Sequence, residues 1–197
     1  MAKAREIEGL RADLPFAEAA AATVAVRADE LFEHAAGVLD TTDIERVHDM
    51  RVASRRLRAV LEIYAPCFPR QQFKPLLKEV KALADALGER RDPDVLLDRL
   101  AELEGVLPKA SRAGIEAFAA PVRAAQEEGN ATLAAALEHA ERGGLRDRLA
   151  LLAASAVEPE APEAPEVADA PAPAAEPEPA AGADGATAAD PAGMPGP

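Results

Sequence analysis

The residues with the clearest potential for chemistry are one histidine and three arginines. They are His48, Arg51, Arg55 and Arg58, and they follow one another at intervals of three, four and three residues. On a helix that turns about 100° per residue, this spacing places the four side chains in one stripe roughly 80° wide. Arginine forms paired hydrogen bonds with phosphate oxygens and stays charged at any physiological pH. The stripe therefore predicts a site for an anion.

A helix that carries such a stripe needs an apolar face to hold it in place. The opposite side of the same segment consists of Val47, Met50, Ala53, Leu57, Val60, Leu61 and Tyr64. The next segment repeats the arrangement, with apolar residues between Phe73 and Leu87 and with the basic residues Arg70, Lys74, Lys78 and Lys81. We therefore expect two neighbouring helices, each with a core face and a cationic face. The plainer alternative is an ordinary solvated charged surface.

The net charge of the whole chain hides this basic region. The 197 residues carry a formal charge of −13, from 22 Lys and Arg against 35 Asp and Glu. Nine of the acids lie after Ser155, where there is no Lys or Arg, so the first 155 residues carry only −4. Residues 46–91 hold eleven bases and five acids. Charge asymmetry of this kind indicates an ion-binding surface within one segment.

Caps, prolines and glycines divide the chain into helical segments. We expect helices over about 14–39, 44–64, 70–87, 92–104, 111–138 and 145–154. Gly88 is expected to end the third of these, Asp92 and Pro93 to begin the fourth, and Pro121 to bend the fifth. The predicted fold is all-α, a compact bundle of about six helices over residues 14–155.

The two ends of the chain have different compositions from this bundle. Residues 1–13 are short and charged, and we expect them to fray. Residues 156–197 consist mainly of Ala, Pro, Glu, Asp and Gly, which cannot bury enough apolar surface to offset the entropy of ordering. They are predicted to form a disordered acidic tail. Two roles stay open for it, a solubilising extension or a competitor for the basic face.

The cysteine count and the hydropathy pattern indicate the cellular compartment in which the protein is expected. Cys67 is the single cysteine, so no internal disulfide can form, which suits a reducing compartment. No run of about 18 uncharged apolar residues and no signal-peptide core is found in the sequence. We expect a cytoplasmic protein that does not enter a membrane.

Two stretches carry a family resemblance. The run VHDMRVASRRLR at residues 47–58, followed by LGERRDPDV at residues 87–95, resembles the signature of the CHAD domain, the conserved histidine α-helical domain. The resemblance implies an all-helical module that binds inorganic polyphosphate and associates with polyphosphate granules. The residues that it implies for binding are His48, Arg51, Arg55, Arg56, Arg58, Lys78, Lys81, Arg90 and Arg91.

The resemblance covers about residues 14–154, which correspond to the first, four-helix-bundle-like half of a domain that usually has two similar halves. A second run of the same kind is absent after residue 112. The hypothesis that follows is a homodimer in which each chain supplies one half, because an isologous pair would restore twofold symmetry.

Several of these residues have a second interpretation. Arg90, Arg91 and Asp92 could form an anion clamp or a structural tie at a turn, and Arg56 lies nearer Asp49 than the stripe does. His48 is expected to be a neutral or phosphate-coupled donor rather than a metal ligand, because neighbouring arginines disfavour its charged form. No nucleophile or nucleotide-binding motif occurs, so we expect neither catalysis nor a cofactor.

Two rival functions follow from the same residues. A basic face could bind nucleic acid, but the few aromatic residues and the acidic total disfavour it. The chain could also act as an accessory or regulatory partner of a phosphate- or triphosphate-metabolising enzyme, since the module is often fused to triphosphate-processing domains.

Overall fold

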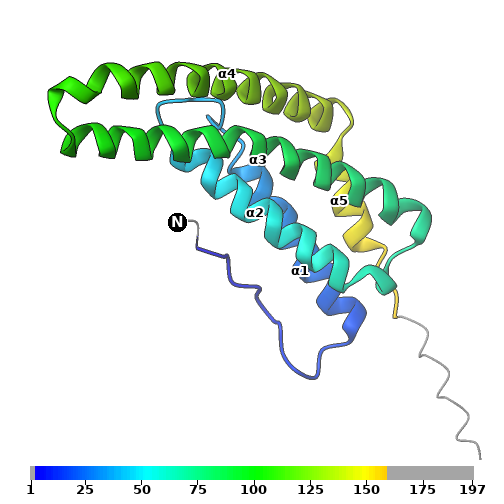
Figure 1. The fold of residues 1–197 in the computed structure, drawn as a ribbon. Coiled ribbons are helices and arrows are strands. Elements are labelled where there is room, and N and C mark those ends of the chain that lie inside the picture. Colours follow the sequence, from blue (N-terminus) through cyan, green and yellow to red (C-terminus); the bar gives the residue numbers. More distant parts are fainter. Residues whose placement is uncertain (1–2, 159–197) are drawn as a thin grey trace, which may run out of the picture. The chain divides into compact units, whose positions relative to one another are not determined.

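The computed structural model describes residues 3–158, and these residues form helices without any strand (Figure 1). The α-helices are α1 (Phe16–Glu33), α2 (Ile44–Ile63), α3 (Arg70–Val106), α4 (Arg112–Arg142) and α5 (Leu145–Ala154). Two 3-10 turns join them, η1 (Ala65–Cys67) and η2 (Lys109–Ser111). The all-α prediction is confirmed. The predicted acidic tail lies outside the described residues from residue 159 onward.

Most of the predicted boundaries are confirmed. Helix α2 begins after Asp43, α3 begins after Pro69, and α5 covers Leu145–Ala154 after the two glycines at 143 and 144. Gly144 has a φ of 61°, the left-handed conformation that glycine adopts without strain. Helix α4 continues through Pro121 without restarting. None of the described helices has a stretch long and apolar enough to cross a bilayer.

Two predictions about the helices are wrong. Helix α1 ends at Glu33, and residues 34–39, which were expected to continue it, form turns. Gly88 does not end a helix and Pro93 does not begin one, because α3 runs through both as a single helix of 37 residues. The described residues therefore form five α-helices instead of about six. An ion pair between Arg90 and Asp94 spans Pro93 and joins the turns on either side of it. The packing of α3 along α4 stabilises this part of the helix as well. The ion pair and the packing together offset the backbone hydrogen bond that proline removes.

The hydrophobic core lies between α1, α2, α5 and the adjoining parts of α3 and α4. Its fully buried side chains include Val24, Leu31, Met50, Leu57, Leu61, Val80, Leu87, Leu133, Leu149 and Leu152. Within the described chain, this core takes no residue of α3 after Leu87 and none of α4 before Leu133. The remaining parts of these two helices run side by side past α1 and α2 (Figure 1). We call this projection, residues 95–125, the arm.

Helices α3 and α4 approach each other closely where the arm leaves the core. A side chain on Gly129 would place its Cβ 3.0 Å from the Glu89 carbonyl oxygen and 3.1 Å from the Cα of Arg90. These are backbone atoms, which cannot move aside without shifting the helix. Gly129 therefore permits a backbone contact between α3 and α4 at this point.

Candidate anion-binding groove

Three arginines of α2 form one wall of a groove on the surface of the fold. Helix α3 supplies the other wall, and the open groove has a volume of about 390 Å³. Its lining consists of Arg51, Arg55 and Arg58 from α2, and of Ala84, Asp85, Gly88, Glu89 and Asp92 from α3. The predicted arginine stripe is thus present as a continuous row along one helix.

The apolar face of α2 holds this row in position. Val47, Met50, Leu57 and Leu61 are completely buried, as predicted, and they fix the rotation of α2 against the core. The arginine stripe consequently faces away from the core. On the opposite wall Gly88 adds no side chain, and a Cβ there would lie 4.0 Å from Nε of Arg51. The guanidinium of Arg51 therefore lies close to the backbone of α3.

Two contacts show that α2 and α3 run antiparallel along the groove. At one end, Nη1 of Arg91 donates a hydrogen bond of 3.0 Å to the carbonyl oxygen of Ile44, at the start of α2. At the other end, Nζ of Lys81 lies 3.0 Å from Oε1 of Glu62, near the end of α2. The row from Arg51 to Arg58 lies between these two contacts.

The arginines of the row differ in how far they are neutralised by the protein. Within residues 3–158, the side chains of Arg51 and Arg55 form no ion pair. Arg58 has a long contact, 3.9 Å from Nε to Oε1 of Glu62, and Glu62 lies nearer to Lys81. Two guanidinium groups of the row thus keep their charge and their donors for a ligand.

Sequence reasoning missed the acidic residues of the opposite wall. Asp85, Glu89 and Asp92 line the groove across from the arginines. They follow at intervals of four and three residues, which is the spacing of one face of a helix. The signal was present in the sequence but it crosses Gly88, where a helix end was expected. The groove therefore has a cationic wall on α2 and an acidic wall on α3.

The charge of the α3 wall changes along its length. The acids occupy the part nearer the arm, and the earlier turns carry Arg70, Lys74, Lys78 and Lys81. Lys78 is exposed and, among the described residues, forms no ion pair. Lys81 lies beside the end of the arginine row through its contact with Glu62. An anion in the groove is therefore favoured toward the end that holds Arg58 and Lys81.

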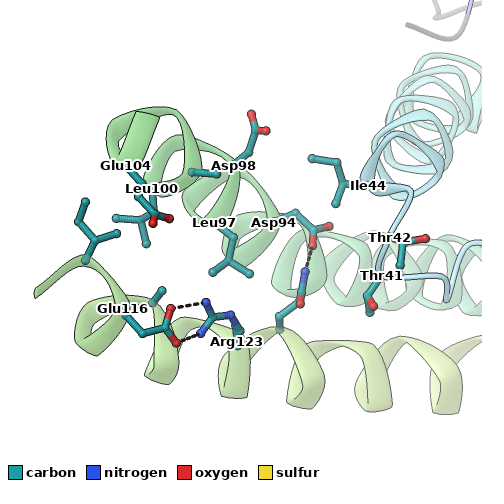
Figure 2. Close-up of a pocket in the computed structure, with 14 residues that line it drawn as sticks. Thr41, Thr42, Ile44, Asp94, Leu97, Asp98, Leu100, Glu104, Glu116 and Arg123 are labelled. Atoms are coloured by element: carbon teal, nitrogen blue, oxygen red, sulfur yellow. Dashed lines mark hydrogen bonds and ion pairs between the residues drawn. The ribbon is translucent and has the colours of Figure 1, made fainter. Parts of the chain in front are cut away.

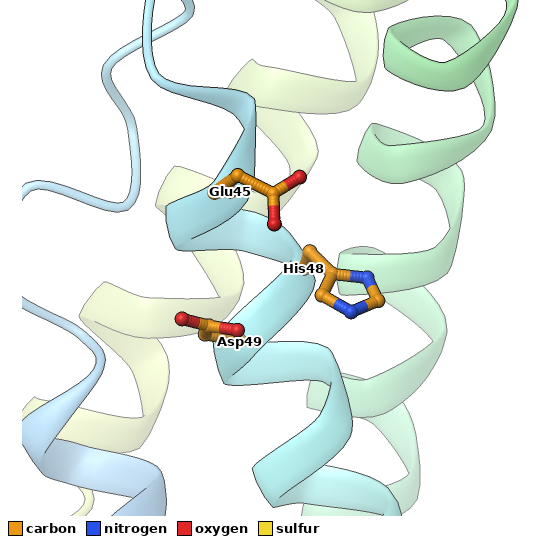
Figure 3. A group of neighbouring side chains, drawn as sticks. All are labelled: Glu45, His48 and Asp49. Carbon is orange, nitrogen blue, oxygen red and sulfur yellow. The ribbon is translucent and has the colours of Figure 1, made fainter. Parts of the chain in front are cut away.

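His48 lies half-buried on α2, one turn before Arg51, and is not among the groove-lining residues. Its ring belongs to a group with Glu45 and Asp49 whose possible ligand atoms lie within 4.8 Å of one another. Figure 3 shows the imidazole and the Asp49 carboxylate pointing to different sides of α2. The guanidinium of Arg91 lies 3.6 Å from Glu45 and opposes a cation at this place.

Arg56 lies away from the groove, and its charge acts on α1. Burial alone would raise the pKa of the Glu30 carboxyl group. Hydrogen bonds from the Arg5 backbone and the Arg27 side chain, with the charges of Arg27 and Arg56, outweigh burial and lower this pKa below its ordinary value. Arg56, which the sequence places nearer Asp49 than the stripe, is not among the residues that line the groove, and its role in polyphosphate binding stays a prediction.

Arg90 was also predicted to bind the ligand, but its side chain is completely buried. Its guanidinium pairs with Asp94, and its Nε donates a 3.1 Å hydrogen bond to Oδ1 of Asn130 on α4. Asp94 also accepts a hydrogen bond of 2.6 Å from Gln126, drawn as a dashed line in Figure 2. Arg90 thus joins α3 to α4 and cannot reach a ligand in the groove.

Arg91 fits the structural interpretation that the sequence left open. Its side chain is only 15% exposed, and it is engaged with the Ile44 carbonyl and with Glu45. It joins α3 to the first turn of α2 and so closes one end of the groove. Of the nine predicted residues, the structure brings Arg51, Arg55 and Arg58 together, with Lys81 next to them.

A second cavity, of about 490 Å³, lies between the arm and the start of α2 (Figure 2). Its charged lining includes Asp94, Asp98, Glu104 and Glu116. The one guanidinium in this lining belongs to Arg123, whose two terminal nitrogens lie 2.7 and 2.8 Å from the carboxylate oxygens of Glu116. Because this guanidinium is already paired and the remaining charged lining is acidic, the cavity does not suit a phosphate ligand.

The fold and the groove together define an all-helical protein with a cationic helix face. The sequence model of the CHAD domain matches residues 22–185, and the chain belongs to the CHAD domain family. This family is associated with polyphosphate and triphosphate.

The chain is also similar to the protein named Uncharacterized protein Rv2226 of Mycobacterium tuberculosis (strain ATCC 25618 / H37Rv). The two are 36% identical over 69 residues, which are 34% of this chain and 14% of that protein. The match therefore spans only a small part of that protein.

The buried position of Arg90 predicts a large effect on stability. Replacement of Arg90 by alanine leaves the carboxylate of Asp94 buried without its charged partner, which should lower the free energy of unfolding by about 3–5 kcal/mol. Urea denaturation followed by circular dichroism measures this. Arg55→Ala is the control, because Arg55 is exposed and unpaired among the described residues; it should change stability by less than about 0.5 kcal/mol. Equal stabilities for the two variants would contradict the structural role of Arg90.

Proposed function

We propose that the groove between α2 and α3 binds inorganic polyphosphate. The observation that carries this proposal is the row of Arg51, Arg55 and Arg58 in one groove, with two of the three guanidinium groups unpaired within the described chain. The row is held by packing of the opposite side of α2, so it is in place before a ligand arrives. Membership of the CHAD domain family supports the same ligand.

The shape of the row suits a linear polymer of phosphates. Successive arginines lie about one helical turn apart, or roughly 5.4 Å along the axis. A flexible chain of phosphates can follow this axis and offer oxygens to each guanidinium in turn, as paired charge-assisted hydrogen bonds. The open groove does not enclose its ligand, so the affinity comes from many contacts in line.

The acidic wall gives the ligand a direction along the groove. Asp85, Glu89 and Asp92 repel phosphate, so the chain is expected to lie against α2 and to continue past Arg58 toward Lys81 and Lys78. Lysine adds positive charge there without the fixed geometry of arginine. We infer that the protein binds the polymer without hydrolysing it and that this binding attaches the protein to polyphosphate granules.

Replacement of the three groove arginines by alanine should abolish binding. Arg51→Ala/Arg55→Ala/Arg58→Ala removes at least three charge-assisted contacts, and we expect the affinity for long-chain polyphosphate to fall by at least about 100-fold. A filter-binding assay at several salt concentrations measures this. The dependence of affinity on salt should become shallower as well, because fewer counterions are exchanged.

The matched control removes the same charge elsewhere. Arg11, Arg142 and Arg146 are exposed and each forms a surface ion pair, so their replacement by alanine should cost little stability. If this control triple weakens binding as much as the groove triple, net charge decides the affinity and the groove is not the site. Circular dichroism should show equal helicity for both triples.

The acidic wall allows a test in which binding improves. Asp85→Asn/Glu89→Gln removes two repulsive charges from the groove and keeps the side-chain shapes. We expect polyphosphate affinity to rise by roughly tenfold at low salt, with a smaller gain at high salt, because screening weakens both attraction and repulsion. Glu127→Gln/Glu128→Gln, on exposed positions of α4, is the matched control. An unchanged affinity in the groove variant would place the ligand somewhere else.

A further inference from the structure

The arm exposes large apolar side chains that nothing in the described part of the chain covers. On α3, Leu96 is 40% exposed, Leu103 is 43% exposed and Val106 is 79% exposed. On α4, Phe118 is 57% exposed. The arm lies beyond the hydrophobic core, which ends at Leu87 on α3. Two paired helices alone cannot cover the outer faces of both, and an apolar patch of this kind marks an interaction surface.

Four leucines of the arm form a regular seam. Leu96, Leu100, Leu103 and Leu107 follow at intervals of four, three and four residues. At about 100° per residue they fall in an arc of roughly 60° on one side of α3. This is the spacing of the apolar positions that pair helices in coiled coils. Leu100 is half-buried, and Leu107 is the C-cap residue directly after the last helical residue, Val106. The seam is thus suited to another helix with the same spacing.

The charges of the arm do not select an acidic or a basic partner. Residues 95–125 contain four bases and four acids. Three of the bases already have partners inside the arm, with Arg99 2.6 Å from Glu102, Arg112 3.7 Å from Glu104, and Arg123 2.7 Å from Glu116. A phosphate polymer or a highly charged protein would therefore gain little here. The partner that fits is electrically neutral and apolar along one helix face.

The rest of this chain does not provide such a face. After residue 158 the sequence has only Val167 and Met194 as apolar side chains larger than alanine or proline, and it holds eight acids and no Lys or Arg. It can neither fill a leucine seam nor form its spacing. A second copy of the chain carries the same seam, and the charge balance of the arm lets two identical arms approach without repulsion.

We propose that the arm is a homodimer interface in which the leucine seam of one copy packs against the same seam of a second copy. With the twofold axis perpendicular to the seam, the two α3 helices run antiparallel and Leu103 of each copy lies near that axis. Helices α3 and α4 of both copies then form a four-helix bundle. Toward the core, the same face of α3 continues with the charged residues Glu89 and Asp92, so the apolar seam does not extend beyond Leu96 in that direction. This interface is separate from the groove and does not depend on the proposed ligand.

The dimensions of the seam give the expected strength of the dimer. From Leu96 to Leu107 the helix rises only about 17 Å, so the contact belongs to the small class of interfaces that form weak complexes. We expect a dissociation constant on the order of 10 µM. The two arginine grooves of such a dimer lie outside the contact, and both stay open to a ligand.

Sedimentation equilibrium of the full chain between 1 and about 300 µM tests this proposal. The average mass should rise from that of one chain, 20.6 kDa, toward twice that value as the concentration increases. Leu103→Glu should hold the protein monomeric by placing charge at the centre of the seam, with an unchanged circular dichroism spectrum. Leu151→Glu, at a 68% exposed position of α5, should associate like the wild type. A wild-type protein that stays monomeric at 300 µM would overturn the proposal.

Cross-linking gives a second readout that does not depend on the fold tolerating a buried charge. Leu103→Cys should form a covalent dimer with a short bismaleimide, because the two introduced thiols lie near the twofold axis. Leu151→Cys should not, and the native Cys67 is completely buried. Association that persists in Leu103→Glu, or equal cross-linking at positions 103 and 151, would place the contact on another surface and refute the seam.

Discussion

The burial of one face of α2 fixes the direction in which the arginine row of the groove points. Val47, Met50, Leu57 and Leu61 have no exposed surface, and each contributes on the order of 2 kcal/mol through burial. A rotation of α2 by one residue would expose this face and bring guanidinium groups toward the core, at a cost of many times the thermal energy. The arginine row is therefore held by apolar packing on the other side of the helix. Because of this, Arg51 and Arg55 need no partner within the described chain to stay in position.

Helix α3 connects the groove to the rest of the molecule. Its first half supplies the core residues and the second wall of the groove, and its last three turns form one side of the arm. Arg90 and Asp94 sit between these two parts and tie α3 to Asn130 and Gln126 of α4. The buried pair thus supports the helix at Pro93, where a hydrogen bond is missing. The Arg90–Asp94 pair therefore has a structural role, although both residues lie in a charged stretch of sequence that is typical of an exposed turn.

The sequence predicted those features that depend on local pattern. The two faces of α2 and the glycine pair before α5 could be read from spacing and residue type alone. The continuity of α3 could not, because Gly88 and Pro93 disfavour a helix locally, and tertiary packing together with the buried Arg90–Asp94 pair compensates for them. Arg90 shows the same limit, since its partner on α4, Asn130, lies forty residues later in the sequence. The acids at 85, 89 and 92 were missed for a related reason, because their common face exists only in an uninterrupted helix.

In the proposed function, the arginine row of α2 contacts a phosphate polymer directly. Arginine side-chain Nε–Hε resonances, followed by NMR during titration with polyphosphate of defined length, test it residue by residue. We expect shifts for Arg51, Arg55 and Arg58, with none for the buried Arg90 or for Arg123, which is paired with Glu116. Unchanged Arg51, Arg55 and Arg58 resonances at saturating polyphosphate would contradict direct binding by the arginine row.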